Sequence, residues 1–194
     1  MKAKNLFFAL AISGTLILPG ACSEGSTRID ETMEELKSTS AQPGCCAVAG
    51  TITDAEAAGL LFMYEEEKMA RDVYAHLATL YTLPVFRNIT KSEQVHMNAV
   101  KTLIIGFKVE DGDILEKGAG DFVNKELKAL YAELIKKGKV SLKAALEVGV
   151  LIEETDIEDL EVQLLAVTNP SVKRVYTNLL AASRVHLKAF SSKL

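Results

Sequence analysis

Apolar residues recur every three or four positions through most of the chain from Thr51 to Leu194, which is the period of an α-helix. The first such segment starts at Thr53, where Glu56 three residues later forms a capping box, and it stops at Leu83-Pro84. No stretch alternates apolar and polar residues for long. The pattern therefore predicts an all-α domain.

Four more helices are expected after the first, and one of them is short. Gly106 is expected to stop the second helix, Ser141 can cap the fourth, and Asn169-Pro170 supplies the cap and first-turn proline of the last. The sequence thus predicts four long helices, with a short extra helix in the connection between helices two and three. The expected segments cover about 53–83, 88–105, 122–138 and 141–166, and the last begins at 169.

The N-terminal segment differs in kind from the helical region. Two lysines precede an apolar run from Leu6 to Leu18, which is too short for a membrane-spanning helix and favours an export signal. The residues from Leu18 to Cys22 resemble a bacterial lipobox, in which Cys22 is acylated, although Pro19 departs from the usual aliphatic residue. We expect residues 1–21 to be a signal peptide and the protein to be exported to the cell envelope. It would be a lipid-anchored membrane protein, or otherwise periplasmic or secreted.

Residues 22–50 are predicted to be a flexible tether between that anchor and the helical domain. They are rich in Ser, Thr, Gly and acidic residues and lack a sustained apolar period. Cys45-Cys46 is the exception in this segment. In an oxidising compartment such a pair can form a vicinal disulfide, cross-link two chains or hold a soft metal ion.

Composition narrows the classes of function. The chain has 194 residues, 48% of them apolar, with 22 basic and 26 acidic residues and a net charge of −4. A basic face that displaces counterions from nucleic acid is therefore excluded. The chain has only three histidines, so few can carry chemistry.

Two of the histidines lie in similar segments ninety positions apart. Residues Ser92 to Val100 resemble residues Ala182 to Phe190, and each segment places its histidine, His96 or His186, on the apolar stripe of a helix. The third, His76, lies about half a helical rotation from the stripe of its own helix and is expected at the surface.

An acidic residue interrupts the apolar stripe of the helix before each of these segments. Glu67 lies 17 residues before Pro84, and Glu153 lies 17 residues before Pro170. The chain therefore carries a helix with Glu followed by a helix with His, twice.

A metal site explains this repeat. A carboxylate buried among apolar side chains costs several kcal/mol unless a cation compensates it. Glu93 and His96 are separated by about one helical turn, so both can face one ion. Mixed oxygen and nitrogen ligands in the centre of a bundle suit iron or manganese.

These motifs resemble a known family. The stretch Glu65 to Tyr74, together with Leu83-Pro84-Val85-Phe86, Ser92-Glu93-Gln94-Val95-His96-Met97 and His186-Leu187-Lys188-Ala189-Phe190, looks like the prokaryotic domain of unknown function family 2202. The order of parts is similar to the ferritin-like superfamily, including rubrerythrins and bacterioferritins, whose first helix carries a Glu with a Tyr seven residues later. Glu67 and Tyr74 match that pair. The resemblance implies a ferritin-like four-helix bundle over residues 51–194.

The resemblance also implies a ligand set for two metal ions. Glu67 would be the terminal ligand of the first ion, His96 its nitrogen ligand, and Glu93 the carboxylate that bridges both ions. Glu153 and His186 would be the terminal and nitrogen ligands of the second ion.

One ligand of the superfamily pattern is missing. A second bridging Glu is expected three residues before the last histidine, where this chain has Ser183. Asp156, three residues after Glu153 on the same helix, is the natural substitute. The competing candidates are Glu154 for Glu153 and Glu66 for Glu67.

The resemblance implies a non-haem di-iron centre, or one with manganese, that oxidises ferrous iron or reduces peroxide or dioxygen. The chain lacks rubredoxin-type cysteine pairs, so an external electron donor would be needed. Tyr74 would be either a redox-active neighbour of the metals or a packing residue. Two other classes stay open: a non-catalytic metal-binding or sensing module of the envelope, and a metal-free structural bundle that binds a partner protein. A homodimer is compatible with the sequence.

Overall fold

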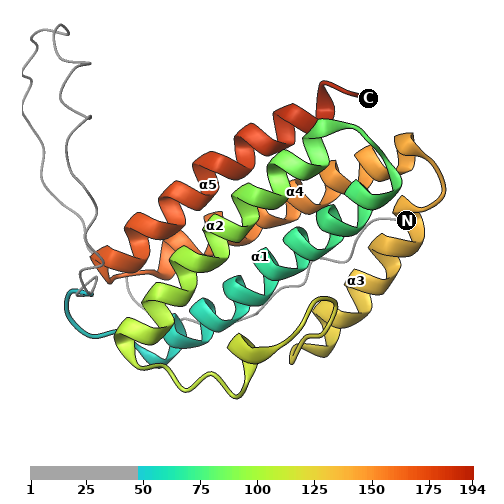
Figure 1. Cartoon of the computed structure of the whole chain (residues 1–194). Coiled ribbons are helices and arrows are strands. Elements are labelled where there is room, and N and C mark those ends of the chain that lie inside the picture. Colours follow the sequence, from blue (N-terminus) through green and yellow to red (C-terminus); the bar gives the residue numbers. More distant parts are fainter. Residues whose placement is uncertain (1–47) are drawn as a thin grey trace, which may run out of the picture. The chain divides into compact units, whose positions relative to one another are not determined.

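The computed structural model describes residues 48–194, which form five α-helices and one 3-10 turn with no strand among them (Figure 1). The prediction of an all-α domain is confirmed. The predicted signal peptide, Cys22, most of the tether and Cys45-Cys46 lie outside the described residues. The elements are α1 (Asp54–Leu80), α2 (Pro84–Phe107), η1 (Ile114–Glu116), α3 (Lys125–Gly138), α4 (Leu142–Ala166) and α5 (Pro170–Ser191).

Three predicted helix starts are confirmed by their caps. At α1 the Thr53 hydroxyl accepts a hydrogen bond from the Glu56 N–H at 3.1 Å, and Glu56 Oε2 accepts from the Thr53 N–H at 2.8 Å. Ser141 accepts from the N–H of Ala144 at the start of α4, and Asn169 caps α5. These side chains satisfy backbone N–H groups that have no partner inside the helix.

The two ends of α2 differ from the prediction. The helix begins at Pro84, four residues before the expected Asn88, because proline is tolerated in the first turn, where its missing N–H has no helical role. Gly106 does not stop the helix, which continues to Phe107 and ends at Lys108 with a left-handed φ of 56°. Gly106 packs directly against the side chain of Val48. A Cβ at position 106 would lie only 2.7 Å from Val48 Cγ1.

The packed domain therefore includes the last residues of the predicted tether. Besides the contact of Val48, the Ala49 N–H donates to the Ser171 hydroxyl at 3.3 Å, and the Asn169 amide donates to the Ala49 carbonyl at 2.8 Å. The described chain is thus held against the helices three residues before Thr51.

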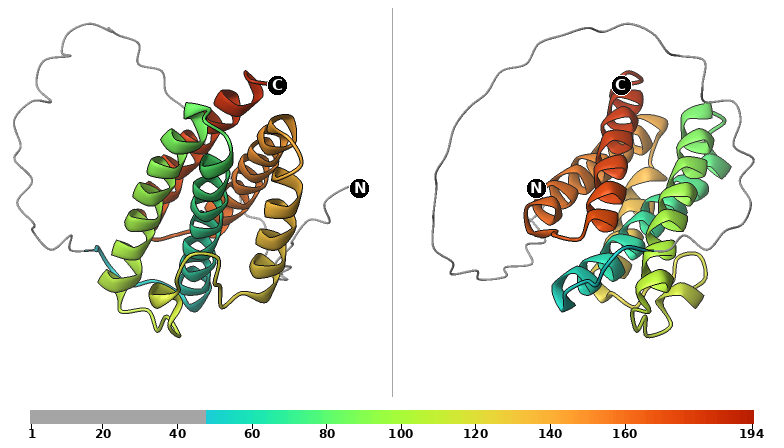
Figure 2. Two further views of the ribbon diagram at one scale, coloured as in Figure 1. Left: turned by 45° about the vertical axis from the view of Figure 1, so that its right-hand side comes forward. Right: turned by 90° about the vertical axis from the view of Figure 1, so that its left-hand side faces the viewer.

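The four long helices pack in two pairs. Helix α1 packs against α2 and α4 against α5, while contacts between α2 and α5 and between α1 and α4 join the pairs (Figures 1 and 2). Helix α3 is shorter and packs against α1 and α4 at the edge of the domain. No helix of residues 48–194 is long and apolar enough to cross a membrane.

The interior contains two apolar clusters separated along the helices by a polar layer. One cluster is built around Tyr74, Phe86 and Phe190, and the other around Met63 and Tyr176. All four long helices change from apolar to polar side chains between the two clusters. The buried polar residues of this layer are Glu66, Glu67, Glu93, His96, Glu153, Asp156, Ser183 and His186.

The connection before α3 is fixed to α1 by charged side chains. The buried Lys68 ammonium donates to Asp72 at 2.8 Å and to the carbonyls of Gly118 and Asp121 at 2.6 and 3.0 Å. The Glu65 carboxylate accepts from backbone N–H groups at the start of α3, which is a favourable position for a negative charge. This explains why Glu65 and Lys68 are buried: they hold the connection.

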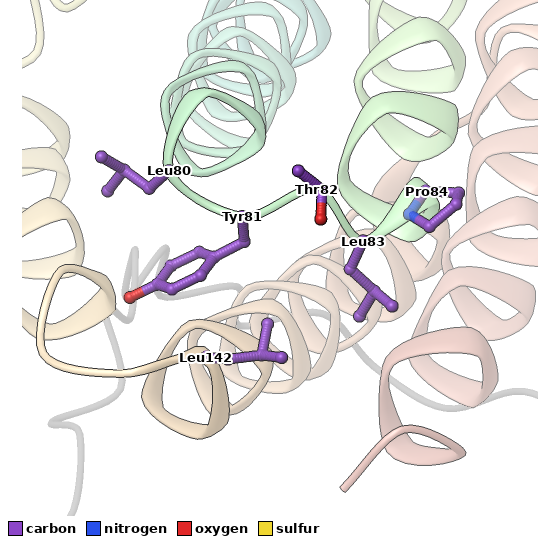
Figure 3. Close-up of a pocket in the computed structure, with 6 residues that line it drawn as sticks. All are labelled: Leu80, Tyr81, Thr82, Leu83, Pro84 and Leu142. Carbon is purple, nitrogen blue, oxygen red and sulfur yellow. The ribbon is translucent and has the colours of Figure 1, made fainter.

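Two hollows on the surface lie away from the polar layer. The one in Figure 3 has a volume of about 430 Å³ and is lined by the turn between α1 and α2 together with Leu142 at the start of α4. The other, about 340 Å³, lies beside Val48 and Gly106. No residue of the predicted metal site lines either of them.

Candidate metal centre

The structure brings the five predicted ligands together in the polar layer. Glu67, Glu93 and His96 form one group, and Glu93, Glu153 and His186 form a second, with the potential ligand atoms of each group within 4.8 Å of one another. All five side chains are buried, the carboxylates to about 2% exposure and the imidazoles to 7%. Glu93 belongs to both groups, which is the position expected of a bridging carboxylate.

The two oxygens of Glu93 face different histidines. Glu93 Oε2 lies 2.7 Å from His96 Nδ1, and Glu93 Oε1 lies 2.9 Å from His186 Nδ1. A further carboxylate approaches each imidazole at the same nitrogen: Glu67 Oε2 at 3.2 Å from His96 and Glu153 Oε2 at 3.5 Å from His186. Each Nδ1 thus faces two carboxylates from two helices.

Tyr74 connects the first helix to the second group. Its hydroxyl donates to Glu153 Oε1 at 2.6 Å, and its ring packs against Phe190 with ring centres 5.0 Å apart. The close approach of Phe190 to α4 requires Gly149, where a Cβ would lie 2.6 Å from the Phe190 ring. Burial, together with the charges of Glu153 and Glu93, raises the pKa of Tyr74 well above its ordinary value. The phenol therefore stays protonated and donates a hydrogen bond to Glu153.

Ser183 occupies the place of the missing carboxylate and holds Asp156. The Ser183 hydroxyl donates to Asp156 Oδ2 at 2.5 Å, and both side chains are buried. Asp156 Oδ1 has no protein partner. Asp156 belongs to neither three-residue group, but it lies beside them, since it raises the pKa of Glu67.

The competing candidates are placed differently from the five. Glu154 is exposed, which favours Glu153 as the inward-facing residue. Glu66 is buried, but it lies in neither group. His76 is half-buried rather than at the surface, and it too is outside both groups.

The buried charges have strongly displaced proton affinities. Burial by itself would lower the pKa of each imidazole, but the hydrogen bonds that His96 donates to Glu67 and Glu93 raise its pKa to about 11, and the contacts of His186 with Glu153 and Glu93 raise its pKa to about 9. Burial would raise the pKa of Glu93, but hydrogen bonds from both histidines lower it to about 2. At neutral pH two imidazolium ions therefore neutralise the Glu93 carboxylate and its neighbours.

The charges of the other carboxyl groups in the layer are compensated less fully than that of Glu93. Burial and the charge of Asp156 raise the pKa of Glu67, despite the hydrogen bond from His96. Burial likewise raises the pKa of Glu153, and it raises that of Asp156 to about 8 despite the hydrogen bond from Ser183. The layer holds more acid than its two histidines can neutralise.

The donor set fits a divalent cation. Glu67 Oε1 and Asp156 Oδ1 are buried and have no hydrogen-bond partner, and Glu93 Oε1 and His186 Nδ1 face each other at 2.9 Å without an aligned hydrogen bond. Buried polar atoms are almost always partnered, so these atoms are the ones available to a bound cation. Carboxylate oxygens and imidazole nitrogens suit iron, manganese and related cations.

Sequence reasoning missed Ser92. Its hydroxyl lies 2.9 Å from His186 Nε2 and 3.4 Å from His96 Nε2. The local sequence signal was a small polar residue directly before Glu93 in a helix whose other inner positions are large. Its contact with α5 spans 94 residues, which no local pattern reveals.

Fold and site together define an all-helical protein with a buried carboxylate and imidazole cluster able to hold metal ions. Residues 56–194 match the family model described as an uncharacterized protein domain, DUF2202, and the chain belongs to this family.

A relative and its solved structure support this assignment. The chain is 43% identical over 139 residues to the uncharacterized protein MJ0754 of Methanocaldococcus jannaschii, covering 72% of this chain and 75% of the relative. The crystal structure of the hypothetical protein MJ0754 is similar with a TM-score of 0.71 at 42% identity, over 73% of this chain and 81% of that one.

Proposed function

We propose that this protein is an exported ferritin-like metal-binding protein whose centre holds two divalent ions, iron by first choice and manganese as the alternative. The proposal depends on one observation above all: two groups of carboxylate and imidazole ligands that share Glu93. The pairing of α1 with α2 and of α4 with α5 supports a ferritin-like four-helix bundle.

The residues of the chain would divide the work as follows. Glu93 would offer one oxygen to each ion, because its two oxygens already face the two histidines. Glu67 and His96 would complete the ligands of the first ion, and Glu153 and His186 would complete those of the second. Asp156, held by Ser183, would serve the centre as a fourth carboxylate.

Bound iron or manganese would supply redox and Lewis-acid chemistry toward dioxygen or peroxide. We infer an oxidoreductase that oxidises ferrous iron or reduces peroxide or dioxygen, with electrons from an external donor. The protein around the centre supports this, because the two apolar clusters exclude water on either side of the polar layer.

A second function has its own supporting observation. Ser183, with no charge, stands where the superfamily pattern has a carboxylate, so one side of the centre has a ligand fewer. A non-catalytic metal-binding or sensing module of the envelope would tolerate that loss more easily than an enzyme would.

The first experiment is metal analysis of the full chain purified without oxygen. We expect close to two ions per chain in the wild type and a large loss in the variant E93A/H96A. The exposed neighbour Glu154 provides the control variant E154Q, which should keep both ions. Absence of bound iron or manganese, with unchanged stability of E93A/H96A, would remove both metal hypotheses and leave the structural bundle.

The second experiment separates an enzyme from a binding module. The ferrous form is mixed with peroxide or with oxygen, and absorbance is followed on the millisecond scale. An enzyme should oxidise in a burst proportional to protein concentration that E93A/H96A lacks, whereas a binding module gives no burst.

The location is a separate part of the proposal. A lipid on Cys22 would anchor the protein to a membrane of the cell envelope. Mass spectrometry of the mature N-terminus tests this directly, and an unmodified cysteine would remove the anchor.

A further inference from the structure

One hydroxyl group touches both imidazoles of the candidate metal centre. Ser92 lies on α2, directly before Glu93, and is half-buried. Its Oγ is 2.9 Å from Nε2 of His186, which comes from α5, and 3.4 Å from Nε2 of His96, one turn further along its own helix. The side chain thus bridges the two halves of the centre on the side away from the carboxylates.

The two imidazole rings present their outer nitrogens to this hydroxyl in parallel. The rings are stacked with centroids 5.4 Å apart and planes inclined by 21°. On each ring Nδ1 faces two carboxylates, so Nε2 is the atom left to face Ser92. Both rings therefore have the same orientation relative to the centre.

A serine hydroxyl is suited to hold two such nitrogens at once. It has two acceptor lone pairs and one donor hydrogen. When Nδ1 offers its lone pair to a cation, Nε2 carries the proton and must donate it, and one oxygen can accept from both rings. Histidines that bind metals almost always donate their other N–H to an oxygen acceptor, most often a carboxylate, a backbone carbonyl or water, which fixes the ring and its protonated nitrogen.

We propose that Ser92 is a positioning residue shared by both histidines, which sets the orientation of the two imidazoles together and so couples the affinities of the two metal ions. The inference rests on the proposed metal centre and adds to it a residue that is not a ligand. The contact with His186 is within the usual hydrogen-bond range and that with His96 is longer. The dependence on Ser92 is therefore stronger on the His186 side.

Alanine at this position would leave both Nε2–H groups without a protein partner. The site is only half-buried, and alanine favours helix, so S92A should fold. Threonine keeps the hydroxyl and is the conservative replacement. The matched control is T102A, because Thr102 is an exposed residue of α2 whose hydroxyl donates only to the carbonyl of Asn98 in its own helix.

The test is a titration of the full-chain protein with Co²⁺ or Mn²⁺ without oxygen, by calorimetry, in the wild type, S92A, S92T and T102A. In S92A we expect the affinity for the ion on the His186 side to fall by about 10- to 100-fold, and that for the other ion to fall by less. S92T should recover most of the affinity, and T102A should match the wild type.

Proton NMR gives a readout that a general loss of packing would not produce. With Zn²⁺ bound, the wild type should show two slowly exchanging imidazole N–H resonances, and S92A should lose the one from His186 first. Unchanged affinities and N–H resonances in S92A, with two ions bound in the wild type, would overturn the role of Ser92 and leave the metal centre intact. A wild type that binds no ion would overturn the proposed function and this inference together.

Discussion

The two halves of the domain, α1 with α2 and α4 with α5, are alike in layout and unlike in chemistry. Each half carries an inward Glu on its first helix and a histidine on its second, at matching distances along the chain. The position three residues before the histidine is Glu93 in the first half and Ser183 in the second. The only carboxylate common to both groups therefore comes from the first half.

The carboxylates of the second half accept hydrogen bonds from hydroxyl groups, and Glu67 of the first half does not. Tyr74 donates to Glu153 and Ser183 donates to Asp156, whereas Glu67 has no hydroxyl partner. The repeat in sequence has produced a Glu and a His in each half, but only the first half supplies the shared carboxylate, Glu93. The comparison predicts that equivalent substitutions in the two halves have unequal effects.

The largest contrast is expected between Glu93 and Ser183, which occupy equivalent positions. E93A should lower the affinity for each of the two ions by at least about 100-fold. The substitution removes a ligand of both ions and leaves the two imidazoles without their shared carboxylate. S183A should still bind two ions. Anaerobic Mn²⁺ titration measures both variants, and equal losses in the two would contradict the asymmetry.

The next contrast concerns Asp156, the acid held by Ser183. D156N keeps the shape and removes the charge, and Asp156 lies near Glu67 and His96 as well as Glu153, so we expect about a 10- to 100-fold loss of metal affinity that reaches both ions. The metal-free protein should respond in the opposite sense. Because the pKa of Asp156 is raised to about 8, ionisation destabilises the fold as the pH rises toward 8, and D156N escapes this. Thermal melts at pH 4 and pH 9 should differ little at the lower pH and favour D156N at the higher.

The dependence on pH should also differ between halves. An ion bound at Nδ1 displaces the proton held there, so affinity rises with pH by up to about tenfold per unit for each proton released. That gain should level off near pH 9 for the His186 side and continue toward pH 11 for the His96 side. Affinity for Mn²⁺ at pH 6, 7 and 8 tests the rise that both sides share, and affinity at pH 9 and 10 tests the difference between them; a flat profile would contradict the rise.

The same protons stabilise the metal-free fold. Since the folded pKa values of both histidines lie above 6.5, their contribution is complete below pH 6.5 and is lost as the pH rises through about 9 and 11. Saturating metal should oppose this loss of stability.

The smallest expected effect is that of the Tyr74 hydroxyl. Y74F removes the hydrogen bond to Glu153 while keeping the ring, so we expect a loss of a few-fold in the affinity of the second ion and little change in the first. Tyr176 is equally buried, with a hydroxyl that has no partner, so Y176F is the matched control. Equal effects of Y74F on both ions would show that the tyrosine serves the whole layer.

Much of the fold could be predicted because its signals are local. The capping box at Thr53, the serine cap at Ser141 and the Asn169-Pro170 pair each act within one helical turn. Pro84 follows the end of one helix by three residues and also begins the next helix. Gly106 does not end its helix; it packs against Val48, which is distant in sequence, and a local pattern does not reveal that contact.

Helical phase and the internal repeat are enough to predict that Glu67, Glu153 and the two histidines face the interior. Contacts between distant segments were beyond reach of that reasoning. Ser92 touches His186 on another helix, and Glu65 is buried because it holds the start of α3. Such roles depend on packing between helices, which periodicity within one helix does not encode.

The connection between the halves, residues 108–141, supplies no member of the two ligand groups. The halves meet at the centre through side chains instead: Glu93 and Ser92 of α2 reach His186 of α5, and Tyr74 of α1 reaches Glu153 of α4. Ions bound there would act as non-covalent cross-links between two helical hairpins. The free energy that holds the two hairpins together would then depend on the concentration of divalent ions around the protein.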